Sequence, residues 1–227
     1  MTLTQFADGL WTDSDPVQIL GMPLAVNMTA LRLANGDLLL YSPLTMTKER
    51  RTAVESLGPV KHLFAPNLYH HRWIGEWAAA YPSARLHAPA GLRKKRADLR
   101  VDREHGAGAE PAFSEVVSEQ RIEGFRLDEC VLVHQPARTL IVADLVQNVG
   151  RPTDLWSKFY TRTMGFYDRV ALSRVIRWTG FSDRVAARAS IDKLLAIPFD
   201  SLIVGHGTPL IRGGREALEK AFSWLSK

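Results

Sequence analysis

The chain has 227 residues, of which 46% are hydrophobic and 23% charged, so it can bury a sizeable core and large-scale disorder is excluded. Its one cysteine, Cys130, excludes an intrachain disulfide, and the apolar run around it predicts a buried core thiol rather than a nucleophile. The net charge is +5, no apolar stretch approaches the roughly 20 residues that span a bilayer, and the N-terminus lacks a secretory pattern, so a cytoplasmic location is expected.

The first predicted element is a hairpin over residues 30–41, in which Asn35-Gly36 between two apolar runs suits a type I′ turn. A helix follows, with Thr47 as its N-cap and Gly58-Pro59 as its stop. The remaining predicted elements are a strand 60–65, a loop 67–71, a helix 73–81, a strand 84–88, an irregular connection 98–112, a hairpin 130–143, a helical stretch 155–178, a helix from Ser182 to about 197, a strand 201–204 and a helix 214–225. This order predicts a single domain, residues 1–227, with an α/β fold: two half-units packed sheet against sheet, with helices outside, as a four-layer αββα sandwich.

Polar side chains follow three of the predicted strands, at the ends where α/β sheets place ligands. These are His70 and His71 after strand 60–65, Asp144 after strand 139–143, and His206 after strand 201–204. Histidine and carboxylate together suit Zn²⁺, Fe or Mn²⁺. Each residue also has an ordinary structural interpretation: the loop histidines as hydrogen-bonded loop residues, and Asp144 as the cap of the next turn. His206 stands between two glycines, which let a backbone turn tightly and bring an imidazole close to a ligand.

Three segments resemble the metallo-β-lactamase superfamily. Residues 190–207, ending in Gly205-His206-Gly207, look like its last helix, last strand and Gly-His-Gly ligand turn. Residues 138–144 look like the strand that delivers its metal-bridging aspartate, and residues 27–41 are similar to its opening hairpin. The resemblance covers roughly residues 20 to 225 and implies a metallo-β-lactamase-like fold with a metal site built from His71, Asp144 and His206.

The chain departs from that family's signature loop, which reads His-x-His-x-Asp-His. The matching loop here is Pro66-Asn-Leu-Tyr-His-His71; with His71 in the last position, His70 replaces the aspartate. The family's middle histidine falls at Gly124-Phe125, and Ser42-Pro43 stands where an Asp-Thr-Gly-like strand end is usual. The chain therefore resembles a degenerate bacterial subfamily in which one metal position is lost. The other position keeps its ligands and gains His70. Asn67 is a candidate to orient these ligands, with a turn-forming role as the alternative.

Two functions are compatible with a site that retains only one of the two metal positions. The first is a mononuclear metal-dependent hydrolase of small ester, thioester or lactone substrates, with one divalent metal, zinc before iron or manganese. His71, Asp144 and His206 are its expected ligands, and His70 is a fourth ligand or a general base. The alternative is a non-catalytic binding protein on the same fold, favoured by the loss of so many usual ligands.

A basic and aromatic segment, residues 155–181, has three interpretations. The first is a helix packed over the rim of the site with solvated arginines, the second a homodimer contact, and the third a peripheral contact with a membrane or an acidic partner. Residues 151–188 hold eight lysines and arginines against three aspartates. Aromatic side chains with basic neighbours also stack on nucleic-acid bases, but no specific nucleic acid is expected as a partner.

Overall fold

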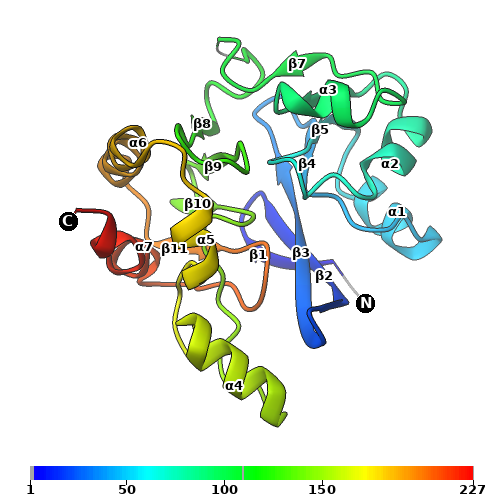
Figure 1. Ribbon diagram of the computed structural model, residues 1–227. Coiled ribbons are helices and arrows are strands. Elements are labelled where there is room, and N and C mark those ends of the chain that lie inside the picture. Colours follow the sequence, from blue (N-terminus) through cyan, green and yellow to red (C-terminus); the bar gives the residue numbers. More distant parts are fainter. Residues whose placement is uncertain (1–2, 109, 227) are drawn as a thin grey trace.

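The computed structural model describes residues 3–108 and 110–226, and in this part of the chain the strands form two sheets (Figure 1). The first sheet has seven strands that follow the chain order, antiparallel from β1 to β4 and parallel from β4 to β7. They are β1 (Thr4–Ala7), β2 (Leu10–Ile19), β3 (Met22–Arg32), β4 (Leu38–Tyr41), β5 (Val60–Phe64), β6 (Arg85–Ala88) and β7 (Arg103–Glu104).

The second sheet has four strands in the order β11-β10-β9-β8. They are β8 (Val117–Arg121), β9 (Cys130–His134), β10 (Thr139–Ile141) and β11 (Ser201–Ile203). The β10–β11 pair is parallel and the other two pairs are antiparallel. Parallel pairing places the ends of β10 and β11 at the same edge, so the residues that follow these two strands become neighbours.

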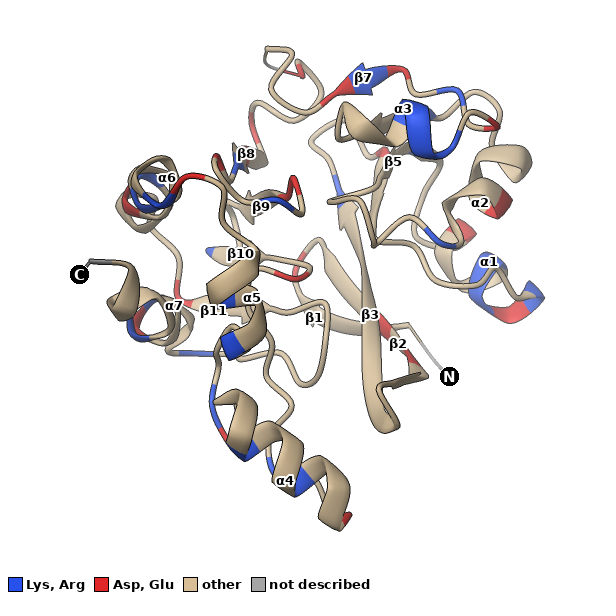
Figure 2. Cartoon of the chain, viewed as in Figure 1, with Lys and Arg blue, Asp and Glu red and all other residues tan. Residues whose placement is uncertain are grey.

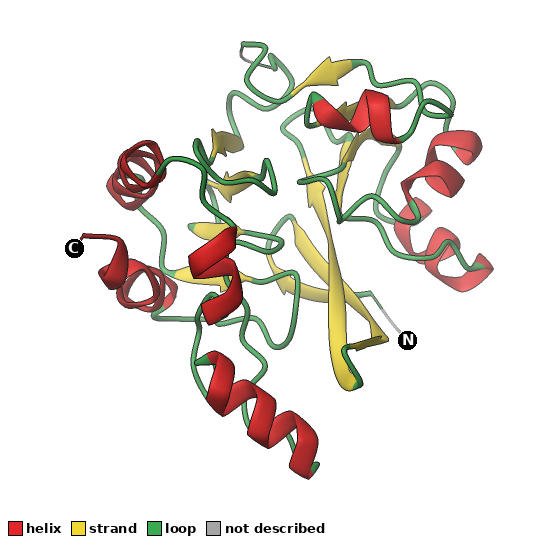
Figure 3. Ribbon diagram, in the orientation of Figure 1, coloured by secondary structure: helices red, strands yellow, loops and turns green. Residues whose placement is uncertain are grey.

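Helices cover the outer face of each sheet, which gives four layers (Figure 3). Beside the first sheet lie α1 (Lys48–Glu55), α2 (Ile74–Ala80) and α3 (Gly91–Lys95), and beside the second lie α6 (Arg184–Ala196) and α7 (Gly214–Phe222). The described chain continues past α7 in a short 3₁₀ turn, Ser223–Ser226. The predicted four-layer αββα sandwich is confirmed.

Four apolar clusters lie in the described residues, and three of them fill the spaces between the layers. Leu38 and Leu40 pack toward the helices of the first sheet, whereas Leu39 and Tyr41 pack between the sheets. Strand β9 alternates in the same way, with Cys130 between the sheets, where it is buried as predicted. Successive side chains of a strand point to opposite faces, so a strand covered on both faces must be apolar throughout.

Local structure departs from the sequence predictions at several places. The turn at Asn35-Gly36 is not type I′, because φ is positive only at Gly36. The amide of Gly36 bonds to the Leu33 carbonyl, so the extra residue is absorbed as a glycine bulge. Thr47 caps α1 as predicted, but Asp183 rather than Ser182 caps α6, because its carboxylate accepts from two backbone amides.

The predicted helical stretch 155–178 is two helices, α4 (Leu155–Met164) and α5 (Arg174–Thr179), because α4 ends at Gly165, whose φ is +80°. The sequence prediction also missed α3, β1, β8 and the long β2–β3 hairpin, and it described residues 98–112, which include β7, as irregular. The β2–β3 hairpin turns at Leu20-Gly21, where both residues have positive φ. No helix in the described residues is long and apolar enough to cross a membrane.

Candidate metal centre

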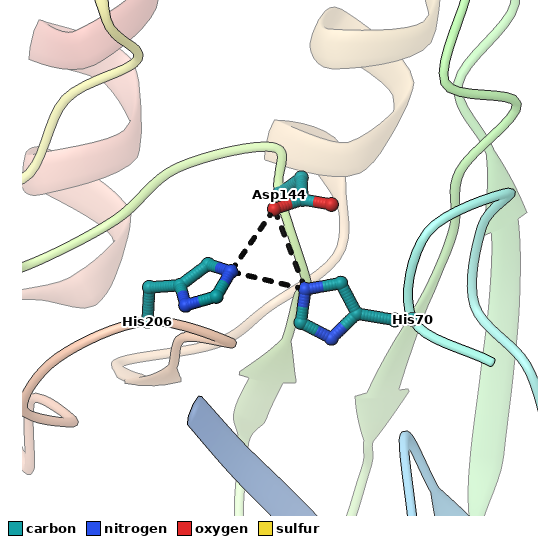
Figure 4. Close-up of side chains that lie close together, drawn as sticks. All are labelled: His70, Asp144 and His206. Carbon is teal, nitrogen blue, oxygen red and sulfur yellow. Dashed lines mark hydrogen bonds and ion pairs between the residues drawn. The ribbon is translucent and has the colours of Figure 1, made fainter. Parts of the chain in front are cut away.

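Three ligand-type side chains meet where strands of both sheets end (Figure 4). His70 lies in the loop after β5, Asp144 follows β10, and His206 follows β11. The Nε2 atoms of the two histidines are 3.1 Å apart. The Asp144 Oδ1 atom lies 3.4 Å from Nε2 of His70 and 3.3 Å from Nε2 of His206. We call these three residues the ligand triad.

The other ring nitrogen of each histidine has a partner. Nδ1 of His206 lies 3.3 Å from the carbonyl oxygen of Ala25, which can only accept, so Nδ1 donates and Nε2 of the neutral ring keeps its lone pair. Nδ1 of His70 lies 2.8 Å from the hydroxyl oxygen of Ser42, which follows β4 with a strained φ of +52°. A metal-binding histidine commonly donates its second N–H to such a partner, which fixes its tautomer and its orientation.

His206 is held in place by the backbone of its neighbours. Gly205 and Gly207 flank it, and a Cβ would lie 2.5 Å from the Ala143 carbonyl oxygen at Gly205 and 2.0 Å from the Asn148 carbonyl oxygen at Gly207. Only glycine therefore lets the end of β11 lie against the segment that carries Asp144. The amide of Asn27 on β3 donates to the carbonyls of Val204 and Gly207 and ties this turn to the first sheet.

Asn67 joins the loop of His70 to Asp144. Its Oδ1 accepts from the backbone amides of Tyr69 and His70, each at 2.8 Å. Its amide nitrogen donates to Asp144 Oδ2 at 2.9 Å and to Glu129 Oε2 at 3.0 Å. The side chain therefore both forms the turn and orients Asp144, the two roles that the sequence left as alternatives.

Glu129 is a buried carboxylate that the sequence analysis did not single out. It immediately precedes β9, is fully buried, and accepts from the backbone amides of Ala143, Asp144 and Leu145 at 2.8, 2.8 and 3.2 Å. An acidic residue at the start of an apolar run was the available signal, because a buried charge requires dedicated partners. Glu129 fixes the backbone on both sides of Asp144.

The charges of this region are strongly coupled. Burial first and the neighbouring Asp144 carboxylate second raise the pKa of Glu129 to about 7, against the hydrogen bonds that lower it. Burial also works against ionisation of Asp144, but His70 and His206 outweigh it and hold its pKa well below the usual range. Burial lowers the pKa of His70, and Asp144 more than offsets this, so that it lies above its usual value. Asp144 is therefore the anionic member of the triad.

His71, which the sequence predicts as a ligand, lies outside this group. His71 is not among the residues whose ligand atoms converge, and its Nδ1 instead lies 3.4 Å from the guanidinium of Arg96. Burial and the cations Lys95 and Arg96 lower its pKa. Two adjacent loop residues point in different directions, and the hydrogen bond from the His70 amide to Asn67 selects His70. The structure thus brings together His70, Asp144 and His206.

A cavity of about 540 Å³ opens onto the ligand triad. Apolar and basic side chains line it, from the β2–β3 hairpin, the loop after β5, residues near 126 and α5. They include Val17, Ile19, Tyr69, Arg72, Trp73, Arg126, Leu127, Ile176 and Thr179. Ile176 and Thr179 of α5 thus lie where a helix packed over the rim of the site would be expected. Neither Arg72 nor Arg126 forms an ion pair with a carboxylate of the described residues.

A second group of ligand-type side chains lies elsewhere between the sheets: His105, Glu119 and Cys130. Both oxygens of Glu119 are bonded to the guanidinium of Arg103, at 2.8 and 2.7 Å. A cation there would compete with a buried arginine for the same carboxylate, so the triad at His70 is the better candidate.

Comparison with known proteins supports the fold. A family model described as a domain of unknown function (DUF4336) matches residues 7–92. No curated protein sequence matches the chain. Among solved structures, a metallo-β-lactamase from Pontibacter korlensis is similar at 15% identity and a TM-score of 0.69, with 99% of this chain and 98% of that chain covered.

Two further metallo-β-lactamases are similar over nearly their whole length. The enzyme FIM-1 from Pseudomonas aeruginosa, in its mono-zinc form, has 14% identity and a TM-score of 0.65, with 99% of this chain and 94% of that chain covered. A metallo-β-lactamase from Erythrobacter litoralis has 14% identity and a TM-score of 0.63, with 98% and 96% covered. The chain therefore has the metallo-β-lactamase fold.

Proposed function

We propose that the protein is a mononuclear metal-dependent hydrolase whose single ion is held by His70, Asp144 and His206. The observation that carries this proposal is the convergence of two imidazole nitrogens and one carboxylate oxygen, with separations of 3.1 to 3.4 Å, beside a cavity. Three protein ligands and an open position are the composition of catalytic zinc sites. FIM-1, which shares the fold, has been obtained in a mono-zinc form.

The donor set fits zinc. Ligands bound tetrahedrally at about 2.0–2.1 Å lie about 3.3 Å from one another, which is close to the separations within the triad. Nitrogen and carboxylate oxygen are ligands that zinc accepts, and iron and manganese accept them as well. When bound, the ion would supply a water of pKa near 7 and polarise a carbonyl oxygen.

The residues of the chain have separate roles in this proposal. His70 and His206 would bind the ion through Nε2, with the Nδ1–H of His70 donating to the Ser42 hydroxyl oxygen and that of His206 to the Ala25 carbonyl. Asp144 offers Oδ1 to the site, since Oδ2 is occupied by Asn67. The general-base role considered for His70 then falls away, because its Nε2 is one of the three converging atoms.

The expected substrate class depends on the loss of the second metal position. Asn67 lies beside Asp144, in a loop that lacks the first two histidines and the aspartate of the family's signature. A single ion cannot stabilise both the attacking and the leaving oxygen of a phosphodiester, as a pair of ions does. Esters, thioesters and lactones, which need one polarised carbonyl, are therefore favoured.

Metal content tests the proposal directly. Protein grown with added zinc and purified without chelators should contain about one equivalent by elemental analysis, whereas His206→Ala should contain almost none. His71→Ala is the matched control, because it removes a histidine of the same region that lies outside the triad, and it should retain the metal. The loaded protein should hydrolyse at least one of a short p-nitrophenyl ester, an acyl thioester and a γ-lactone, and His206→Ala should not.

Two results would contradict the proposal. If His71→Ala loses the ion while His206→Ala keeps it, the ligand set is wrong. If the wild type binds no metal and hydrolyses none of the three substrates, the alternative of a non-catalytic binding protein replaces the hydrolase.

A further inference from the structure

Helix α4 leaves several of its large apolar side chains exposed, although Tyr160 and Met164 pack against a small core beside the β2–β3 hairpin. Leu155 is 83% exposed and Phe159 is 63% exposed, whereas Ser157 and Thr161 are buried against the protein. A surface helix normally turns its apolar stripe to the core and its polar residues to water. This arrangement leaves Leu155 and Phe159 largely in water, and exposed apolar faces of this kind mark sites of interaction.

The exposed face continues onto the β2–β3 hairpin. The indole N–H of Trp156 donates to the carbonyl of Leu20 at the hairpin tip, 2.9 Å away, and the rings of Trp156 and Phe159 are in contact. Leu20 itself is 66% exposed and has a φ of +51°, a conformation that costs energy for a leucine. We call Leu20, Leu155, Trp156 and Phe159 the apolar rim; it lies where α4 projects from the body of the molecule (Figure 1).

Basic residues accompany the apolar rim (Figure 2). Lys158 follows Leu155 by three positions and Arg162 follows Phe159 by three, so each basic side chain neighbours an exposed apolar one on the helix surface. Neither basic residue forms an ion pair in the described part of the chain, although the pKa of Asp154, one turn before Lys158, is lowered by hydrogen bonds with Ser157 and, to a lesser degree, by Lys158; Arg162 lies over the ring of Tyr167. A second copy of the chain would bring the same positive charge to the contact, whereas an anionic surface complements it.

The hairpin connects the apolar rim to the candidate site. Its tip, Leu20, belongs to the rim, while Val17, Gln18 and Ile19 line the cavity that contains the ligand triad. Ile176 of α5 lines the same cavity. A molecule held beside the apolar rim therefore lies next to an apolar entrance to the cavity.

We propose that the apolar rim seats the protein on a bilayer that contains anionic lipids. Apolar and aromatic side chains with adjacent lysine and arginine are the composition that binds the interface of a charged bilayer. We further infer that the substrate is an amphipathic acyl ester drawn from that bilayer, a part that rests on the proposed function. In this reaction water adds its oxygen to the acyl carbon, the bond from that carbon to the alcohol oxygen breaks, and the alcohol takes a proton from the water, leaving a carboxylic acid.

Vesicle sedimentation tests the membrane contact. The probes are vesicles of phosphatidylcholine alone and vesicles with phosphatidylserine added, and the wild type should bind the second kind. Leu155→Ser with Phe159→Ser should lower the partition coefficient on the order of a hundredfold, because two apolar side chains no longer enter the interface. The matched control is Val185→Ser, which changes an 81% exposed residue of α6 and should leave binding unchanged.

A double variant, Lys158→Gln with Arg162→Gln, measures the contribution of positive charge to vesicle binding separately from that of the apolar side chains. At about a fivefold effect for each basic residue near a charged surface, binding to the anionic vesicles should fall roughly thirtyfold. Because the replaced side chains of the rim are exposed, unfolding midpoints should stay at the wild-type value. Unchanged vesicle binding in the Leu155/Phe159 variant would overturn the proposal. The proposal would also be overturned if neither the wild type nor this variant bound vesicles, while the wild type formed a concentration-dependent dimer or bound an acidic protein and the variant did not.

The substrate inference has its own readout. The Leu155/Phe159 variant should lose at least tenfold in rate on a long-chain ester embedded in anionic vesicles and keep its rate on a soluble short-chain ester. Equal rates on the embedded ester would overturn the substrate inference. The His206→Ala variant should bind vesicles like the wild type, so a failed hydrolase leaves the membrane proposal standing, and a failed vesicle assay leaves the hydrolase standing.

Discussion

Replacing Asn67 by aspartate tests whether this side chain holds the candidate site together. The substitution keeps the shape and the Oδ1 acceptor for the amides of Tyr69 and His70, but removes both N–H donors to Glu129 and Asp144. Hydrogen bonds to a charged acceptor contribute about 1.5–3 kcal/mol each, so their loss should lower the free energy of unfolding by about 3–6 kcal/mol. The introduced aspartate is also a third buried carboxyl beside Glu129 and Asp144, so the three charges repel one another or one of the carboxyls takes up a proton.

Urea unfolding of the metal-free protein at pH 7.5 measures this loss. Asn35→Asp is the control, because it makes the same chemical change at an exposed turn, and it should cost less than about 1 kcal/mol. In the folded fraction, zinc affinity measured by competition with a chromophoric chelator should fall about 10- to 100-fold, since Asp144 loses the group that orients it. A loss of stability below about 1 kcal/mol together with unchanged zinc affinity would refute the role assigned to Asn67.

Two further predictions concern the neighbouring histidines. Ser42→Ala should weaken zinc binding about tenfold or more without altering the fold, because Nδ1 of His70 loses its partner; equal zinc dissociation constants in the two proteins would exclude this role. Burial lowers the pKa of His134 to about 4, so the unfolded chain takes up its proton first, and stability should fall as the pH drops below about 6.5. Between pH 6.5 and 5 this residue accounts for about 2 kcal/mol of the loss in the free energy of unfolding. His134→Asn keeps an acceptor for the amide of Ala137 and should remove that part of the loss, as measured by urea titrations at several pH values. An unchanged pH dependence would show that His134 does not contribute.

The sequence determined the layers and the approximate location of the site. Strands such as Leu38–Tyr41 are apolar at every position because both faces are covered, and that pattern can be read without coordinates. The Gly-His-Gly turn and the aspartate after β10 can be recognised in the sequence as candidate metal ligands, because each directly follows an apolar strand. The position of His206 beside Asp144 follows from the parallel pairing of β10 and β11.

Which histidine joins the triad was decided only by the tertiary structure. His70 and His71 have the same side chain and adjacent positions, so no periodicity separates them. The choice depends on Asn67, whose hydrogen bonds reach residues 62 and 77 positions away. Glu129 acquires its role in the same way, through amides that lie 14 to 16 residues along the chain.

In the segment from 155 to 178, too, the sequence determined some properties and the tertiary structure decided others. Its sequence indicated helix, aromatic character and positive charge, because these are properties of composition and local spacing. Composition does not say which face of α4 meets the protein. The docking of that helix beside the β2–β3 hairpin turned Ser157 and Thr161 inward and left Leu155 and Phe159 in water, because burial depends on what the rest of the chain places opposite each face.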